Sequence, residues 1–336
     1  MRSTMNAIIS SGYGSSDVLK YSIAEKPIPK PHEVLVQIHA TSVTAAHVAM
    51  RTGKPIIGRF FLGMLKPSNP VSGTDFAGEI VAIGNNVKKF SVGEKVFGST
   101  DIEGGTYAEF LTISENGVLF NKPSNISYAQ ATAIVDGAAT ALPFLLYSGR
   151  ISKGMSVLIN GASGSIGTAA VQLAKYFGAN VTGVCSTSNI ELVKSLGADT
   201  VIDYTQTDFT KNGIHYDIIF DTVGVLKFSK VKNSLSEHGT YLSPVLNSSV
   251  LFNMLKTSFS KSKKAIFSAT GMLDIVKKIS NFETIKELLE QELIVPVIDR
   301  TYQLSQIPEA HIYVDKGHKK GNVVIDIFGE AHTDLS

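Results

Sequence analysis

Cysteine is almost missing from this sequence, because Cys185 is the only one among 336 residues. A single thiol excludes a disulfide framework or a multi-cysteine metal site built within the chain. Long apolar runs are missing too: the most apolar stretch, "AIVDGAATALPFLLY", is interrupted by Asp136 and Pro143, and the first twenty residues hold no apolar core behind a basic start. We therefore expect a soluble, cytoplasmic protein with no membrane partner.

A strong charge of either sign is also lacking. The formal net charge is +2 and the basic residues are scattered, so we expect no nucleic-acid partner. With 43% apolar residues, 18% charged residues and 11 prolines, the composition is typical of a folded globular protein. The length exceeds the size at which one hydrophobic core usually stops growing, so we expect two domains of roughly 120 to 200 residues each.

The chain changes character near residue 126. Before it, alternating residues such as Val34, Val36 and Ile38 predict short half-buried strands, separated by glycine, proline and asparagine. After it, helical patterns alternate with apolar stretches, which predicts β-α-β crossovers and an α/β fold with a parallel sheet. The expected helices are 127–146, 165–177, 189–196, 283–291 and 305–316, and the strands expected in the second part are 156–160, 180–185, 200–203 and 217–221.

Three evenly spaced glycines follow the buried-type strand "SVLIN" and open the helix "SIGTAAVQLAKYF". At such a junction glycine allows a tight turn and lets the backbone approach an anion at the positively polarised start of a helix. The spacing G-x-x-G-x-x-G is a variant of the dinucleotide-binding fingerprint, although a glycine trio by itself also occurs in ordinary turns. The cofactor-binding residues predicted in this turn are Gly161, Ser163, Gly164, Ser165, Ile166 and Gly167.

Two other nucleotide-binding classes are disfavoured. No lysine followed by serine or threonine succeeds the glycines, as a nucleoside-triphosphate P-loop would require. None of the eleven tyrosines has a lysine four positions later, as short-chain dehydrogenases would require. The glycine turn therefore predicts a nicotinamide dinucleotide.

The region where NAD-preferring folds place an acid for the ribose 2′-hydroxyl carries hydroxyl groups instead. It reads Cys185, Ser186, Thr187, Ser188 and Asn189. Hydroxyls and an amide can donate to a 2′-phosphate, whereas a carboxylate would repel it, so NADPH is favoured over NADH. The alternative is a hydroxyl-rich surface loop without a ligand.

The order of these parts resembles the medium-chain dehydrogenase/reductase superfamily, through "NGASGSIG", "SLGADTVIDYT", "YDIIFDTVG" and "GTYLS". Within it, "GYGSSDVLKY", "HATSVTAAHVAMRTG", "PVSGTDFAGEIVAIGNNVKKFSVGEKVFG", "GTYAEF" and "GHKKGNVVI" are similar to the zinc-free quinone oxidoreductase branch. The resemblance implies a GroES-like β-rich catalytic domain over 1–125, completed by 266–336, and a doubly wound Rossmann domain over 126–265. It also implies a substrate site between the two domains and a homodimer.

Zinc enzymes of this superfamily hold their catalytic metal at positions that align here with Thr44, Thr74 and roughly Asp136. Two threonines and one carboxylate make a poor zinc site, because zinc takes imidazole, thiolate and carboxylate ligands. We therefore expect no metal. Without a Lewis acid, reduction of a quinone or of an α,β-unsaturated carbonyl is favoured over direct alcohol oxidation.

The resemblance also suggests the remaining site residues. The catalytic candidates are Thr44, His47, Asp75 and Asp136, and the further cofactor candidates are Thr140, Tyr204, Val223 and Asn322. His47 is a proton donor or a structural hydrogen-bonding residue, and Asp75 is functional or structural. Asp136 touches the nicotinamide or substrate, or caps a helix, and Tyr204 lies beside the 2′-phosphate or serves packing.

The leading hypothesis is thus an NADPH-dependent, metal-free oxidoreductase that transfers hydride to a quinone or an enone. Two alternatives stay open. One is an alcohol/carbonyl oxidoreductase of the same superfamily, which needs an electrophile other than zinc. The other is a protein that binds NADPH as a sensing or structural ligand without turnover.

Overall fold

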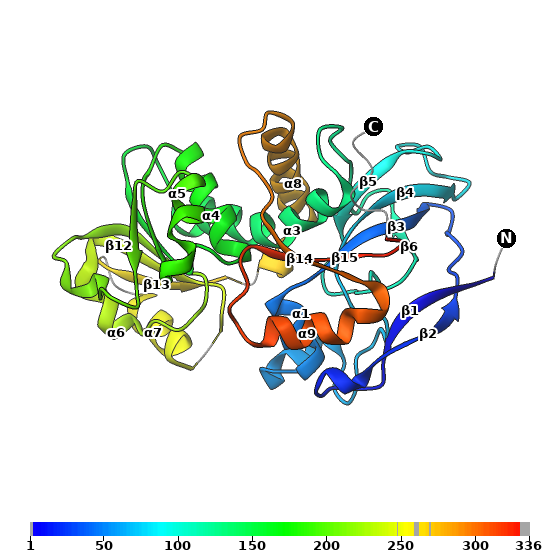
Figure 1. Ribbon diagram of the computed structural model, residues 1–336, viewed down its shortest axis with the longest axis horizontal. Helices are drawn as coiled ribbons and strands as arrows, with labels where there is room; N and C mark the ends of the chain where they lie inside the picture. Colours follow the sequence, from blue (N-terminus) through cyan, green and yellow to red (C-terminus); the bar gives the residue numbers. More distant parts are fainter. Residues whose placement is uncertain (1–2, 247, 259–261, 269, 330–336) are drawn as a thin grey trace. The chain divides into compact units, whose positions relative to one another are not determined.

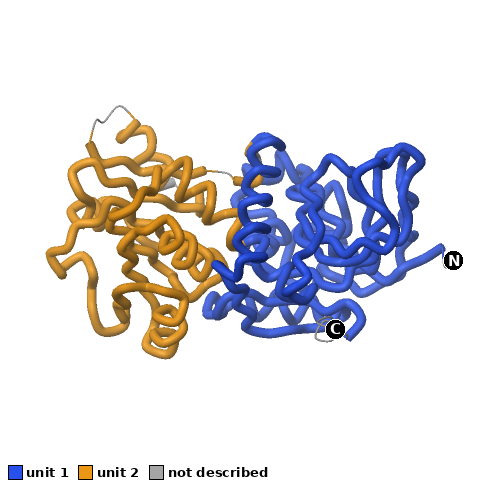
Figure 2. Tube along the Cα trace, turned by 90° about the horizontal axis from the view of Figure 1, so that it is seen from above, with its two compact units in different colours: residues 1–136, 274–336 blue, residues 137–273 orange. Residues whose placement is uncertain are grey.

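The computed structural model describes residues 3–246, 248–258, 262–268 and 270–329, which form two compact units (Figure 2). Among the described residues, unit 1 runs up to Asp136 and resumes at Asp274, while unit 2 runs from Gly137 to Leu273. These divisions fall later in the chain than the expected boundaries after residues 125 and 265. The reason is that helix α3 (Tyr128–Pro143) contributes to both units, and that strand β13 (Lys264–Phe267) is hydrogen-bonded within the sheet of unit 2.

Unit 1 is built on a mixed sheet of seven strands in the order β14-β15-β3-β4-β5-β7, with β6 also paired to β3 (Figure 1). The pair β14-β15 is parallel, the other pairs are antiparallel, and β1 and β2 form a separate antiparallel pair. The strands are β1 (Thr4–Ser10), β2 (Leu19–Glu25), β3 (Glu33–Val43), β4 (Asp75–Ile83), β5 (Lys95–Ser99), β6 (Phe110–Ser114), β7 (Val118–Asn121), β14 (Ile298–Gln303) and β15 (Asn322–Asp326).

The alternating residues predicted for the first part lie in the core of this sheet. Val34, Val36 and Ile38 of β3 are fully buried and pack in one cluster with Phe76 and Ile80 of β4. Removal of these side chains from water supplies the main driving force for this sheet. The predicted strand is therefore confirmed, but buried residues lie on both of its faces rather than on one face only, because it lies in the middle of the sheet.

The helices of unit 1 are α1 (Ala45–Thr52), α2 (Arg59–Leu62), α8 (Ile275–Glu290) and α9 (Ile307–Asp315). Helix α1 packs against α9, and an ion pair between buried Arg51 and exposed Asp315 joins them, with 2.7 Å between Arg51 Nη2 and Asp315 Oδ2. Helix α8 packs on β7, where the rings of Phe120 and Phe282 stack 5.8 Å apart. The sequence predicts α8 eight residues too late because Ile275 and Val276 are exposed and hide the helical period.

Unit 2 contains a six-stranded parallel sheet in the order β10-β9-β8-β11-β12-β13 (Figure 1). Counted from the first strand of the unit, this is the order 3-2-1-4-5-6 of a Rossmann fold. The strands are β8 (Ser156–Asn160), β9 (Asn180–Cys185), β10 (Thr200–Asp203), β11 (Tyr216–Asp221), β12 (Leu235–Ser243) and β13 (Lys264–Phe267). The helices after α3 are α4 (Ser165–Tyr176), α5 (Ile190–Ser195), α6 (Phe228–Val231) and α7 (Ser248–Ser258).

Local patterns located the first half of unit 2 well. The predicted strands 156–160, 180–185 and 200–203 coincide with β8, β9 and β10, and the helix predicted over 165–177 is one residue longer than α4. Both α7 and β13 were missed. Strand β13 is only four residues long and its burial comes from its place beside β12, which no local pattern reveals.

The apolar stretch around α3 forms a helix whose side chains are mostly buried in the core of the protein. Residues Tyr128–Ser148 are long and apolar enough to cross a membrane by length and composition, but 72% of their most apolar window is buried inside the protein. The helix continues past Pro143 as a π-helical turn, Phe144–Ser148, in which Phe144 and Leu145 are fully buried. The burial of its side chains, and not a membrane, accounts for the apolar composition of this helix.

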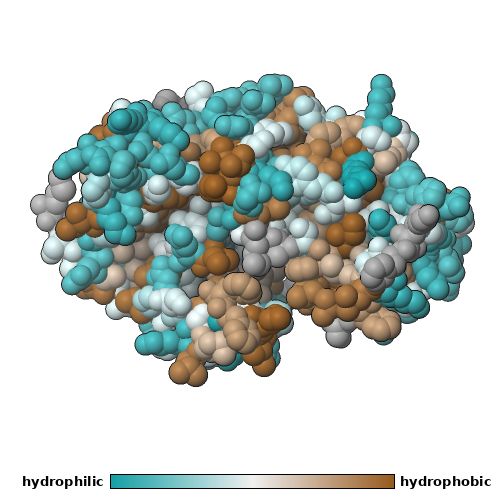
Figure 3. All heavy atoms as spheres, turned by 180° about the vertical axis from the view of Figure 1, so that it is seen from behind, coloured by the Kyte–Doolittle hydropathy of each residue, from teal (hydrophilic) through white to brown (hydrophobic). Residues whose placement is uncertain are grey.

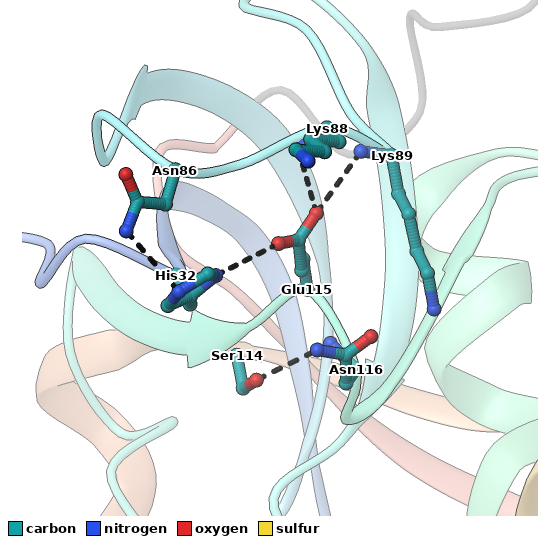
Figure 4. A network of polar contacts seen from close by, with 7 residues as sticks. All are labelled: His32, Asn86, Lys88, Lys89, Ser114, Glu115 and Asn116. Carbon is teal, nitrogen blue, oxygen red and sulfur yellow. Dashed lines mark hydrogen bonds and ion pairs between the residues drawn. The ribbon is translucent and has the colours of Figure 1, made fainter.

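A polar network holds the turn between β4 and β5 (Figure 4). The Glu115 carboxylate accepts the backbone N–H groups of Lys88 and Lys89 at 2.7 and 3.0 Å. His32 bridges the same carboxylate, at 3.3 Å from Nδ1, and the Asn86 side chain, at 3.2 Å from Nε2. The two backbone N–H groups lower the pKa of Glu115, so the carboxylate stays charged and keeps the turn in place at neutral pH.

Candidate cofactor and active site

The glycine turn lies at the carboxyl end of β8, where the strand order of the Rossmann sheet reverses. Gly161 adopts a left-handed conformation with φ of 77°, which only glycine takes at little cost. The backbone N–H groups of Gly161 and Ala162 both donate to the carbonyl oxygen of Val184 at 3.0 Å. These two hydrogen bonds fasten the turn to the neighbouring strand β9.

The other two glycines meet different demands. A Cβ on Gly167 would collide with the carbonyl oxygen of Gly161 and lie 2.8 Å from the backbone of Ala162, so this glycine allows α4 to pack against the turn. A Cβ on Gly164 would find the Gly161 oxygen, at 3.4 Å, as its nearest neighbour, and the φ of Gly164 is an ordinary −82°. The fold therefore requires glycine at 167, whereas at 164 glycine keeps a surface of the backbone bare.

Helix α4 begins directly after this bare backbone. Gly164 is its N-cap residue and has no side chain to satisfy the first N–H groups, which lack acceptors within the helix. Their partial positive charge attracts an anion at the start of α4. Ser163 is buried and its hydroxyl accepts the Asn189 side-chain N–H at 2.9 Å, which ties the turn to the end of β9. The turn thus fits the pyrophosphate of a dinucleotide.

A buried carboxylate that the sequence analysis missed holds the opposite side of this turn. Asp221, at the end of β11, has no exposed surface. It accepts the side-chain N–H of Asn160 at 2.8 Å, the backbone N–H groups of Gly224 and Leu226 at 3.0 and 2.7 Å, and the Tyr241 hydroxyl at 3.0 Å. These bonds fix the loop after β11, from which the predicted cofactor residue Val223 packs against Gly161.

Replacing Asp221 by asparagine is expected to lower the free energy of unfolding by about 2 to 4 kcal/mol, because an amide NH₂ would face buried donors. Asp217, on the same strand, provides the control: it accepts the Ser156 N–H and the Ser236 hydroxyl but is partly exposed. Urea denaturation of both variants measures the difference. Equal losses for Asp217→Asn and Asp221→Asn would contradict the role given to buried Asp221.

The region predicted to hold the adenosine ribose contains an acid after all. Asp203, at the end of β10, accepts the hydroxyl of Thr187 at 2.5 Å, together with the backbone N–H of Thr205 at 2.9 Å. These hydrogen bonds lower the pKa of Asp203, so it is negatively charged at neutral pH. The hydroxyl proton of Thr187, expected to serve a 2′-phosphate, is therefore directed at Asp203.

The neighbouring predicted residues keep more freedom. The Ser186 and Ser188 hydroxyls lie 3.4 Å apart, and the Ser188 hydroxyl donates to the Asn189 side chain at 3.3 Å. Tyr204 is 57% exposed, so its ring is available to a ligand rather than packed in the core. Cys185 is buried, and burial raises the pKa of its thiol to about 11, which leaves it unreactive at neutral pH.

Three of the four predicted catalytic residues, Thr44, His47 and Asp75, lie in one network of hydrogen bonds, which Thr74 completes. Thr44 is the N-cap residue of α1: its hydroxyl accepts the His47 N–H at 3.3 Å, and its own N–H donates to His47 Nδ1 at 3.2 Å. The other ring nitrogen, Nε2, lies 2.8 Å from the Thr74 hydroxyl, which donates to Asp75 at 3.1 Å. Ser42 donates to the other oxygen of Asp75 at 2.8 Å.

The hydrogen bonds of this network run in one direction, from Thr44 through His47 and Thr74 to Asp75. Because His47 Nδ1 accepts from a backbone N–H, Nε2 carries the ring proton and donates to Thr74. Burial lowers the pKa of His47 to about 4, so the ring is neutral at pH 7. Burial, and then the charge of Asp136, raises the pKa of Asp75 to about 7. Within this network of hydrogen bonds, the carboxyl group of Asp75 rather than the ring of His47 gains and loses a proton near neutral pH.

The remaining candidates are divided between the two units. Asp136 and Asn322 belong to unit 1. Thr140 lies in the last part of α3, which belongs to unit 2. Asn322 is buried at the start of β15, where its side-chain N–H donates to the Val297 carbonyl at 3.1 Å.

Lys319 is a further residue that the sequence analysis passed over. Its ammonium group donates to the Gly321 carbonyl oxygen at 2.6 Å. Burial lowers its pKa to about 8, while the charges of Asp136 and Asp299 oppose the shift. The sequence signal for Lys319 was the lysine pair in "HKKGNVVI", just before the predicted final strand. Such a pair is typical of a solvated surface cluster, and only the position of Asp136 in the fold distinguishes it from one.

The comparisons with known proteins agree with this organisation. Residues 30–124 match the alcohol dehydrogenase GroES-like domain family, and residues 196–325 match the zinc-binding dehydrogenase family. The chain is 33% identical to the mitochondrial NAD(P)H oxidoreductase RTN4IP1 of Mus musculus, over 97% of this chain and 90% of the relative. It is 32% identical to the chloroplastic quinone-oxidoreductase homolog of Spinacia oleracea, over 96% of this chain and 98% of the relative.

A solved structure extends the likeness to the fold. The quinone oxidoreductase from Coxiella burnetii superimposes with a TM-score of 0.85 at 26% identity, over 96% of this chain and 99% of that one. The predicted α/β fold, with a GroES-like unit and a Rossmann unit, is confirmed. The chain belongs to the medium-chain dehydrogenase/reductase superfamily, in its quinone-oxidoreductase-like branch, and is an NAD(P)H oxidoreductase.

Proposed function

We propose that this protein is an NADPH-dependent reductase that transfers hydride to a quinone, or to an α,β-unsaturated carbonyl, without a metal. The observation that carries the proposal is the glycine turn with its bare backbone at Gly164, at the positively polarised start of α4, where the N-cap residue makes no side-chain hydrogen bond. The cytoplasmic location and the homodimer expected from the sequence are part of the same proposal, and they rest on composition and resemblance alone.

The metal-free part of the proposal is supported by what the aligned threonines do. Thr44 caps α1, and Thr74 links His47 to Asp75, so both hydroxyls have structural partners. Within the described ranges, no group of three or more His, Cys, Asp or Glu side chains is placed to hold a metal ion. Thiolate, imidazole or carboxylate ligands are what a catalytic zinc needs.

In the proposed reaction the reduced nicotinamide supplies a hydride, and the accepting oxygen must then gain a proton. Asp75 is suited to supply it, because its pKa of about 7 leaves part of its population protonated at neutral pH. When Asp75 is protonated, its O–H would donate to the Thr74 oxygen, the reverse of the bond that its carboxylate accepts. Asp75 is buried whereas Thr74 is partly exposed, so Thr74 would then pass its own hydroxyl proton to the accepting oxygen. His47 holds Thr74 in place.

The negative charge of Asp203 lies beside the hydroxyl-rich loop and opposes a 2′-phosphate there. We propose that Ser186 contacts the 2′-phosphate, while Asp203 orders Thr187 and Thr205 and limits the preference. Ser186→Ala is then expected to raise KM for NADPH about threefold or more and leave KM for NADH unchanged. Asp203→Asn is expected to lower the ratio of KM for NADPH to KM for NADH, because it removes a negative charge beside the 2′-phosphate.

Turnover of the purified protein tests the proposed function. NADPH or NADH is mixed with a panel of quinones, alkenals and ketones, and loss of the reduced-nicotinamide absorbance is followed before and after chelator treatment. We expect oxidation with quinones or alkenals that survives the chelator. Stoichiometric zinc, or turnover of ketones alone, would favour the alcohol/carbonyl reductase, and tight nucleotide binding without turnover across the panel would favour a sensor.

A further inference from the structure

Segment 54–66, between α1 and β4, exposes an unusual number of apolar side chains. It reads "KPIIGRFFLGMLK". The exposed members and their exposed fractions are Ile56 69%, Ile57 59%, Phe60 69%, Phe61 55%, Met64 55% and Leu65 92%. Brown, hydrophobic patches also break the teal surface on the face drawn in Figure 3. Single exposed apolar residues are normal, but a contiguous group of this kind marks an interaction surface.

The charges within this segment have one sign, although Glu103 lines a cavity beside Phe61 and Leu62. Lys54 and Lys66 stand at its two ends and are exposed, and Arg59 lies in its middle. From residue 51 to residue 74 the sequence contains no aspartate or glutamate. Apolar side chains together with basic residues on one short stretch are suited to a surface that is apolar below and anionic on top.

The segment is fastened to the fold in several places. The Tyr13 hydroxyl donates to the Gly63 carbonyl oxygen at 2.6 Å, and the Arg59 guanidinium lies 4.4 Å from the centre of the Tyr13 ring. Arg59 Nε also donates to the Gly53 carbonyl oxygen at 3.1 Å. The apolar side chains are thus presented from a held backbone, so little conformational entropy is lost when a partner covers them.

A cavity of about 370 Å³ lies behind the same segment. Phe61 and Leu62 of the segment line it, together with Tyr13, Met50 and Ile102. Its walls are mostly apolar, with Ser68, Ser72 and Glu103 among the polar members. This cavity in unit 1 could therefore accommodate an apolar group, such as part of a lipid acyl chain, that entered beside α2.

We propose that segment 54–66 docks this protein on the surface of an anionic lipid bilayer. The apolar side chains would enter the boundary between headgroups and acyl chains, while Lys54, Arg59 and Lys66 would meet the anionic headgroups. This replaces the expectation from the sequence that the protein has no membrane partner. The inference is independent of the proposed function, because docking requires neither a cofactor nor turnover.

A second copy of the chain fits this surface less well. In a two-fold dimer the same patch meets itself, so the positive charges of Lys54, Arg59 and Lys66 would face their own equivalents. Within 51–74 there is no carboxylate to compensate them. Like charges brought together at an interface oppose association.

Sedimentation of the full chain with vesicles tests the proposal. Vesicles of phosphatidylcholine alone are compared with vesicles that also contain phosphatidylserine. We expect the bound fraction to be at least about tenfold higher on the anionic vesicles and to fall with added salt, because headgroup attraction is screened. Ile57→Ser/Phe60→Ser/Leu65→Ser should reduce binding at least tenfold, and Lys54→Glu/Lys66→Glu should remove the preference for anionic vesicles.

Helix α7 supplies the matched control. Leu251, Phe252 and Leu255 are 49%, 65% and 66% exposed, and a triple serine variant there removes comparable apolar surface from unit 2. We expect this variant to bind vesicles as the unmodified chain does. Absence of binding to anionic vesicles, equal losses in both triple variants, or an oligomer that dissociates only when segment 54–66 is changed would overturn the proposal. Thermal unfolding of each variant verifies that it is folded.

Discussion

Gly164→Ala is expected to weaken binding of the dinucleotide at least tenfold while the protein stays folded. The added methyl group would have the Gly161 oxygen, at 3.4 Å, as its nearest neighbour, and the backbone angles at 164 suit alanine. The methyl group would, however, occupy the surface on which a pyrophosphate approaches the backbone. Equilibrium binding of NADPH, followed by cofactor fluorescence, measures the loss, and thermal unfolding without cofactor measures the stability.

Gly167→Ala provides the contrast three residues further along. Here the methyl group would collide with the Gly161 carbonyl and the backbone of Ala162, which has no flexible side chain to move aside. We expect a loss of about 2 kcal/mol or more in the free energy of unfolding, as is typical of overpacking. If Gly164→Ala destabilised the protein as much as Gly167→Ala and bound NADPH normally, the site assigned to the turn would be refuted.

The second large effect concerns Asp75. In the folded protein its pKa is raised to about 7 from the ordinary 3.8, first by burial and then by Asp136. An acid with a raised pKa in the folded state contributes stability that is fully present below the unfolded pKa and is lost as the pH rises through the folded value. Above pH 7 the buried charge therefore costs stability, and Asp75→Asn should increase the free energy of unfolding there by about 2 to 4 kcal/mol. The partners of Asp75 are hydroxyls, which can turn to accept from an amide, unlike the backbone N–H groups around Asp221.

Urea denaturation of both proteins between pH 4 and pH 8 measures this effect as a difference. The other groups that act on the site are Asp136, Asp101, His47 and Tyr107, and all are present in both proteins. His47 acts in the opposite sense, because its lowered pKa of about 4 removes stability as the pH falls below about 6.5. Taking the difference removes its contribution.

Asp136→Asn adds an independent arm to this experiment. The charge of Asp136 raises the pKa of Asp75, so its removal should move the pH at which stability declines to a lower value. Parallel pH curves for the unmodified protein and Asp75→Asn would show that Asp75 does not titrate in this range. That result would also remove Asp75 as the proposed proton donor.

Features that depend on neighbours in the chain were predicted closely. The strand "SVLIN", the glycines at 161, 164 and 167 and the helix after them were all located from sequence, because turn chemistry and apolar period act within a few residues. The parallel sheet followed from the same alternation. Thr44, a catalytic candidate from the sequence, caps α1 through its hydroxyl, and its part in catalysis stays a prediction.

Predictions that depended on distant contacts were incomplete. A hydroxyl-rich loop favoured NADPH, but Asp203 reaches Thr187 from sixteen positions away and brings a negative charge there. The sequence left His47 as a proton donor or a structural hydrogen-bonding residue, and the contact of its buried, neutral ring with Thr74, 27 positions away, favours the second. Asp221 gave no signal, because a carboxylate at the end of a strand is recognised as buried only when all its donors are placed.

The sequence by itself determined the α/β character of unit 2 and the position of the turn, since periodicity, glycine spacing and helix start signals act over short stretches of chain. Its motifs carried the resemblance to the superfamily, while the order of the strands came from the folded sheet. Tertiary structure decided the rest: which groups are removed from water and which partners they meet. Burial and nearby charge place the pKa of Asp75 near 7 and that of His47 near 4. Desolvation and charge pairing depend on distance in space, so the titration of these groups became apparent only in the folded chain.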